Sequence, residues 1–147
     1  MIDNLKKDSV FGEPFLLPEE SQQLLCLCKS ETRVLFIAYE HVIKRCENAC
    51  KFHSQLVSNL LQMIALRASQ QANRIYVLSR NSIRKKIMTY LNSIAAEKQT
   101  KTVILPMSYT TFAEYLSVDR SAMMRELKNL ADEGIIERDG KKLRILD

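Results

Sequence analysis

Residues 106–146, PMSYTTFAEYLSVDRSAMMRELKNLADEGIIERDGKKLRIL, decide the fold. Their pattern predicts a short helix over 109–116, a tight turn, a second helix over 119–131 and two short strands joined at Asp139-Gly140. Asp119 is a good N-cap, because its carboxylate can accept the unpaired N–H groups of the first helical turn. Asp-Gly between apolar runs favours a type I′ hairpin turn. This order predicts a helix-turn-helix with a β-hairpin wing, a layout that places one helix in the major groove of DNA.

The second helix has one apolar and one polar side. Its expected buried stripe is Ala122, Met123, Leu127 and Leu130. We expect Arg120, Ser121 and Arg125 to read bases, because arginine can donate twice to guanine and serine can pair with donors or acceptors. Residues expected to contact phosphates, which fix register, are Tyr109, Thr110, Thr111, Lys128, Lys141 and Lys142. The alternative is that all these groups are ordinary solvated surface residues.

The charge distribution supports a polyanionic partner. The chain has 147 residues, 46% of them hydrophobic, and a net charge of +5, which is enough sequence for one or two small domains. Residues 1–73 carry 8 Lys+Arg and 8 Asp+Glu, whereas residues 74–147 carry 14 and 9, so the whole excess lies with the helix-turn-helix. Such a half can bind DNA through counterion release. The start, MIDNLKKDSV, lacks the apolar run of a signal peptide, and no segment has the roughly 18 apolar residues of a membrane span.

A long helix is predicted over residues 48–79, which contain neither proline nor glycine. Two stripes with alternating spacings of four and three run along it. We interpret the first as the seam of a parallel homodimer; it consists of Leu56, Leu60, Met63, Arg67, Gln70, Arg74 and Val77. The second is expected to pack on the chain's own domains; it consists of Val57, Leu61, Ile64, Ala68, Gln71, Ile75 and Leu78. The alternative is a core helix of a monomer, although a helix of roughly 45 Å is long for this chain to wrap.

Shorter elements are expected around these two. A helix over 82–97 carries Arg84, Lys85 and Lys86 on its polar side, where they either touch phosphates or are solvated. Residues 103–106 predict a short strand that pairs with the wing. Residues 24–28 and 34–37 also read as strands, although so few strands cannot close a stable sheet without more chain.

The sequence offers little for catalysis or metal binding. We expect the four cysteines to be reduced, as buried or half-buried small apolar residues or, less favoured, as ligands of a shared metal or iron–sulfur cluster; they are Cys26, Cys28, Cys46 and Cys50. His41 and His53 have no obvious carboxylate or cysteine partner, and three glycines cannot supply a glycine-rich phosphate loop. We therefore predict no enzyme activity, no metal and no cofactor.

The order and spacing of several segments resemble the C-terminal two-thirds of the Crp/Fnr family of bacterial transcription regulators. The matching stretches are VFGE (10–13), VLFI (34–37) with a short helix after it, FHSQLVSNLLQMIA (52–65), LSRNSIRKKIMTYL (78–91) and 105–136. The resemblance implies a mainly α fold with a small amount of β. It consists of a partial β-roll remnant (1–45), a long dimerisation helix (46–80) and a C-terminal winged helix-turn-helix that binds DNA (81–147). The chain is expected to begin in the last third of the β-roll.

The resemblance also implies partners. It implies a cytoplasmic homodimer on a palindromic operator of double-stranded DNA, with helix 119–131 in the major groove, no membrane contact, and RNA polymerase considered as a further partner. Gly12 and Glu13 match half of the family's cyclic-nucleotide motif, but Gln22-Gln23 stands where its arginine belongs. We expect no cyclic-nucleotide binding, because a buried phosphate would lack a countercharge. The alternative function is a truncated regulator or protein–protein adaptor that acts through the coiled-coil helix without specific DNA binding.

Overall fold

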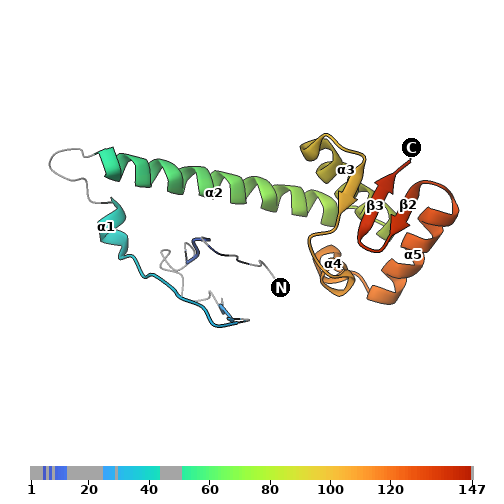
Figure 1. Ribbon diagram of the computed structural model, residues 1–147, viewed down its shortest axis with the longest axis horizontal. Coiled ribbons are helices and arrows are strands. Elements are labelled where there is room, and N and C mark those ends of the chain that lie inside the picture. The colour runs from blue at the N-terminus through green and yellow to red at the C-terminus, as the bar shows by residue number, and fades with distance from the viewer. Residues whose placement is uncertain are drawn as a thin grey trace. The chain divides into compact units, whose positions relative to one another are not determined.

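The structure is a computed structural model that describes residues 5, 7, 9–12, 25–28, 30–43 and 51–146. The chain divides into two compact units, one from Leu66 to the C-terminus and one over residues 2–65. Figure 1 shows the helices and strands along the chain. In sequence order they are α1 (Tyr39–Ile43), α2 (Lys51–Leu78), α3 (Ile83–Lys98), β1 (Thr102–Ile104), α4 (Tyr109–Leu116), α5 (Arg120–Asp132), β2 (Ile136–Asp139) and β3 (Lys142–Ile145).

The C-terminal unit has the helix-turn-helix and wing that the sequence predicts. Helices α4 and α5 begin and end within one residue of the expected positions. The three strands form an antiparallel sheet in the order β1-β3-β2, with Val103 and Arg138 both opposite Leu143. The predicted pairing of the strand before the helix-turn-helix with the wing is therefore confirmed. Gly140 forms the wing turn at φ +54°, a left-handed conformation that glycine adopts without strain.

One apolar core joins all elements of this unit. The largest fully buried side chains are Phe112, Ile87, Leu91, Leu116, Met123, Leu127, Leu130, Ile136, Leu143, Val77 and Val103. Three of the four residues in the predicted buried stripe of α5 are among them, and Ala122 is half-buried. Inside the core the Tyr90 ring lies 4.9 Å from that of Phe112 and 5.4 Å from that of Tyr115, in tilted and edge-on geometries that favour aromatic pairs. Burial raises the pKa of Tyr90 to about 12, so its hydroxyl stays neutral.

The C-terminal end of α2 belongs to the same unit. Val77 is fully buried in the core. The Asn73 amide donates to the Ser93 hydroxyl of α3 at 3.2 Å. The Arg74 guanidinium lies 5.0 Å from the centre of the Tyr115 ring, a cation–π contact. The last turns of the long helix are thus part of the domain that carries the helix-turn-helix.

The two stripes of α2 differ in exposure, and not as expected. The stripe interpreted as the dimer seam is half-buried at most positions and ends in Val77, inside the chain's own core. The stripe expected to pack on the chain's own domains is open instead: Leu61 and Ile75 are 67% and 68% exposed, and Ile64 is 48% exposed. That expectation is wrong for these residues. The reason is that Val77 enters the core, which turns the other stripe away from the domain at that end.

The N-terminal unit departs from the prediction of strands. Residues 25–28 and 34–37 are described and contain no strand, although α1 follows as expected. Leu25, Leu35 and Phe36 are each more than 80% exposed. A strand exists only when a neighbour pairs with its backbone groups, and among the described residues these segments have no such neighbour.

The smaller expectations for this part of the chain have mixed outcomes. Cys26 and Cys28 are exposed rather than buried, whereas Cys46 and Cys50 lie outside the described residues. Gly12 has a φ of +105°, and Glu13 also lies outside the described residues. Within the described ranges there is no group of three or more histidine, cysteine or acidic side chains that could hold a metal ion. None of the helices described is long and apolar enough to cross a membrane.

Candidate nucleic-acid interface

The turn between α4 and α5 sets the angle of the helix-turn-helix. Ser117 ends α4 in the left-handed conformation (φ 52°), and the next amide, that of Val118, donates to the Ala113 carbonyl at 3.1 Å. The Lys86 ammonium of α3 donates to the Leu116 carbonyl at 3.1 Å, which supplies a cation to the C-terminal end of the α4 dipole. These contacts fix where α5 begins.

Asp119 caps α5 as predicted. Its Oδ1 accepts hydrogen bonds from the Ala122 amide at 2.9 Å and from the Ser121 hydroxyl at 2.6 Å. The hydrogen bond from Ser121, followed by that from the Ala122 amide, lowers the pKa of the carboxyl group. The ionised carboxylate accepts only, so the Ser121 hydroxyl must donate its proton to it. What Ser121 can then offer to a DNA base is its lone pairs.

Replacing Asp119 by alanine is expected to lower the melting temperature of the C-terminal unit by about 5 °C at pH 7. Asparagine at this position keeps a capping oxygen and is the matched control, expected to lose less. The folded-state pKa lies below the ordinary value of 3.8, so this carboxylate stabilises the fold above that pH and less as the pH falls. Calorimetry from pH 7 to pH 3 should therefore show the gap between wild type and Asp119→Ala closing below about pH 4. A gap independent of pH would contradict the role of the charge.

The three candidate base-reading residues lie together on α5. Arg120, Ser121 and Arg125 are all exposed and occupy the N-terminal half of the helix, whose opposite face is buried in the core. Lys128 is exposed one turn further on, and Met124 is half-buried. In this structure the predicted readers form a polar, cationic surface with no core role.

The candidate phosphate contacts are divided between α4 and the wing. Thr110 is exposed in the first turn of α4, and the Thr111 hydroxyl lies 3.0 Å from that of the N-cap residue, Ser108. Lys141 and Lys142 are exposed beside the wing turn. These side chains lie at two different elements of the same domain, as a protein that follows a duplex backbone requires.

Tyr109 has a structural role that the sequence did not suggest. Its hydroxyl donates to the Gly140 carbonyl at the wing turn, and the Arg138 guanidinium lies 5.7 Å from the centre of its ring. Partial burial raises the pKa of this hydroxyl, so it keeps its proton. Since that proton is already donated within the chain, Tyr109 in this arrangement holds the wing turn against α4. The partners are 31 positions apart in the sequence, which explains why no local pattern revealed the contact.

Tyr109→Phe is expected to loosen the wing without unfolding the domain. The ring keeps its packing, but the hydroxyl that holds the Gly140 carbonyl is lost. Hydrogen exchange at residues 138–142 should accelerate, whereas exchange in α3 and α5 should not change. Equal acceleration throughout the domain would instead indicate a general loss of stability.

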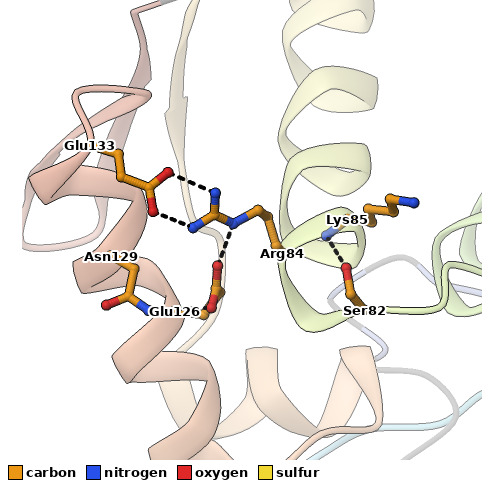
Figure 2. A network of polar contacts seen from close by, with 6 residues as sticks. All are labelled: Ser82, Arg84, Lys85, Glu126, Asn129 and Glu133. Atoms are coloured by element: carbon orange, nitrogen blue, oxygen red, sulfur yellow. Dashed lines mark hydrogen bonds and ion pairs between the residues drawn. The ribbon is translucent and has the colours of Figure 1, made fainter.

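The predicted basic cluster at the start of α3 is mostly engaged within the fold. Figure 2 shows the Arg84 guanidinium between two carboxylates of the α5 segment, those of Glu126 and Glu133. Lys86 serves the end of α4, as described above, whereas the Lys85 side chain is exposed. The sequence leads us to expect that the three cations are either solvated or face phosphates. Within the part of the chain that the structure describes, only Lys85 of the three is free of contacts within the fold that would prevent one of these roles.

Comparison with known proteins agrees with this geometry. Residues 85–147 match the family model of the Crp-like helix-turn-helix domain. A curated relative, the probable transcriptional regulator flp of Lacticaseibacillus casei, is 39% identical over 70 residues, which are 48% of this chain and 32% of the relative. The match thus spans about a third of the length of that relative. Among solved structures, FixK2 from Bradyrhizobium japonicum has a TM-score of 0.55 at 21% identity, covering 69% of this chain and 52% of that one.

The curated relative is a probable transcriptional regulator, which agrees with the expectation that the chain is not an enzyme. The likeness to FixK2 supports the fold, which the helix-turn-helix and the three-stranded wing sheet already define. Residues 85–147 therefore match a Crp-like helix-turn-helix domain, and the comparisons are consistent with the Crp/Fnr-type regulator that the sequence predicts.

Proposed function

We propose that this chain is a transcription regulator that binds a palindromic operator of double-stranded DNA as a homodimer, with α5 in the major groove. The observation that carries the proposal is the exposed trio Arg120, Ser121 and Arg125 on a helix whose opposite face is fully buried. A helix held in this way can enter the groove without exposing the core. The net charge of +5 in the second half of the chain supports the attraction to DNA.

Each reader has a chemical role in this proposal. The arginines can each donate two hydrogen bonds to guanine O6 and N7. Ser121, whose proton goes to Asp119, would accept from an exocyclic amine, N4 of cytosine or N6 of adenine. The expected operator half-site therefore contains guanine with cytosine or adenine at the neighbouring step. Thr110, Thr111, Lys128, Lys141 and Lys142 would hold the phosphates, and Tyr109 would act through the wing.

The dimer is proposed to form along α2. A helix of 28 residues with an open apolar stripe needs a partner to remove that stripe from water. We assign the contact to the exposed stripe that contains Leu61, Ile64 and Ile75, and we keep the stripe that contains Leu60 and Met63 as the alternative. Two copies on DNA would place their recognition helices about 34 Å apart, one helical turn of the duplex.

The remaining parts of the proposal follow from the family. Residues 81–147 would be the DNA-binding domain, residues 46–80 the dimerisation helix, and residues 1–45 part of an effector-binding β-roll. RNA polymerase is a further proposed partner. A protein of this function works in the bacterial cytoplasm, where the DNA is.

The test is selection of bound duplexes from a random pool, followed by gel shift at several salt concentrations. Recovery of a palindrome with a guanine in each half-site would support a dimeric, sequence-specific regulator. Weak binding that is lost with salt and does not depend on sequence would refute the proposal, because only nonspecific electrostatic attraction through counterion release would remain. The adaptor that acts through its long helix would then be the better description.

A further inference from the structure

The most extensive polar network in the described residues joins the start of α3 to α5. Arg84 Nε donates to Glu126 Oε1 at 2.6 Å, and its two terminal nitrogens donate to the two oxygens of Glu133 at 2.7 and 2.5 Å. The contact with Glu133 is thus bidentate, as Figure 2 shows. The partners are 42 and 49 residues away in the sequence, so this network is a tertiary contact and not a feature of one helix.

The two carboxylates mark a line along α5. They are seven residues apart, which is about two helical turns, and therefore lie on the same side of the helix. Glu126 is in the middle of α5, whereas Glu133 is its C-cap residue. Arg84 consequently touches the recognition helix at its middle and at its end. The readers Arg120 and Arg125 lie in the other half, on a different side.

The Arg84 network adds directional contacts to the apolar packing that holds α5 on the domain. Met123, Leu127 and Leu130 hold the helix on the domain through apolar contacts, which are non-directional. A guanidinium that pairs bidentately with one carboxylate and singly with a second adds fixed directions to that packing. A small rotation of α5 about its axis would move every reader relative to the base edges, and catalytic or binding groups lose much of their effect when displaced by about 1 Å.

We propose that Arg84 is a positioning residue for DNA readout, which sets the rotation and tilt of α5 through Glu126 and Glu133. The inference rests on the proposed function, and it adds a residue on α3 that touches no DNA. Its first consequence concerns stability. The Arg84 and Glu133 side chains are 38% and 47% exposed and that of Glu126 is 22% exposed, so solvent screens these ion pairs and limits what they contribute to folding. Loss of the network should therefore change sequence discrimination far more than it changes the melting temperature.

Two variants separate position from charge. Arg84→Lys keeps the positive charge but cannot form the fork. Arg84→Met combined with Glu126→Gln and Glu133→Gln removes all three charges and the ion pairs together. In both, the ratio of affinities for the selected duplex and a scrambled duplex should fall about tenfold, while the melting temperature stays within about 5 °C of wild type.

The matched control is Arg144→Gln on β3. Arg144 pairs with Glu137 at 3.7 Å, with both side chains at least 60% exposed, so the variant removes one cation from the same domain without touching α5. It should weaken binding to both duplexes alike and leave their ratio unchanged. Two outcomes overturn the proposal: an unchanged ratio in Arg84→Lys, or a normal ratio in the charge-free triple variant. The second would mean that Arg84 only neutralises acidic groups near DNA.

A measurement without DNA keeps the inference separate from the proposed function. Spin labels at Asn92→Cys on α3 and Asp132→Cys on α5, in the full chain with its four native cysteines replaced by serine, report the distance between these helices. Dilution with unlabelled chain removes signals between copies. The distance distribution should be narrow with Arg84 and broader or shifted with Arg84→Lys. If it does not change, Arg84 does not position α5, even if wild type selects an operator. If it changes while wild type selects no sequence, the proposed function fails and the positioning stands.

Discussion

Alanine at both Arg120 and Arg125 is expected to abolish sequence discrimination while leaving a folded protein that still binds DNA weakly. Each arginine that pairs bidentately with guanine contributes roughly 1–3 kcal/mol of discrimination. The pair together should therefore cost about 10²- to 10⁴-fold in affinity for the selected duplex. Both side chains are exposed and have no part in the core, so the melting temperature should stay within a few degrees of wild type.

The control for this prediction is a variant that removes the same amount of charge from the wing turn instead of from α5. Lys141→Ala/Lys142→Ala also removes two positive charges, from the exposed wing turn. Phosphate contacts carry no sequence information, so this variant should weaken binding to all duplexes and reduce the slope of log K against log salt by about 2. Fluorescence anisotropy on selected and scrambled duplexes, at three or more salt concentrations, measures both quantities.

The contrast between the two variants decides what α5 does. If both lose affinity equally for the two duplexes, the arginines bind phosphate and the protein reads DNA by shape or not at all. If the wing variant loses discrimination and the α5 variant does not, the wing is the reader. The proposed function requires that only the α5 variant loses it.

The elements of the helix-turn-helix could be predicted because their signals are local. Asp119 caps α5 with a side chain three residues from the amide that it accepts, and Gly140 permits the turn between β2 and β3. Periodicity then identified Met123, Leu127 and Leu130 as the buried face. The cap, the turn and the buried face each depend mainly on residues close together in the sequence, so the sequence alone was sufficient to predict these three features.

The contacts that the sequence did not reveal join distant residues. In the sequence, Arg84 is one of three cations at the start of a helix that either touch phosphates or are solvated, and only the packing of α3 on α5 brings it to Glu133. Tyr109 reads as a polar residue at the edge of the site, and only the fold brings it to Gly140. Residues 34–37 have the composition of a strand, but β-structure depends on a partner that composition cannot guarantee.

The face of α2 that would join two copies is a further part of the proposal, and a pair of matched variants separates the two alternatives. Leu61→Lys/Ile64→Lys places two charges on the stripe that the structure leaves open, where these residues are 67% and 48% exposed. Leu60→Lys/Met63→Lys places the same two charges one position earlier, on the half-buried stripe that the 4-3 spacing suggested as the seam.

We expect Leu61→Lys/Ile64→Lys to convert the dimer to monomer, with a dissociation constant raised at least about 100-fold, because two charges would have to be buried in an apolar seam. Sedimentation velocity over a range of concentrations measures this. The operator affinity should fall with the dimer, because two half-sites bound by linked copies gain from effective concentration, whereas a monomer binds only one. Binding of a single half-site should not change, since α5 is untouched.

Each alternative predicts a different pattern. If Leu60→Lys/Met63→Lys dissociates the dimer and the other pair does not, the seam runs along the half-buried stripe and α2 must rotate about its axis on association. That rotation would be resisted at the C-terminal end, where Val77 is fully buried and Arg74 packs over Tyr115. The resistance is the physical reason for preferring the open stripe: it can meet a second copy without taking any side chain out of the core. If the wild type is monomeric at all concentrations, neither stripe of α2 forms a dimer interface. The proposal that a two-fold dimer binds a palindromic operator would then be wrong as well.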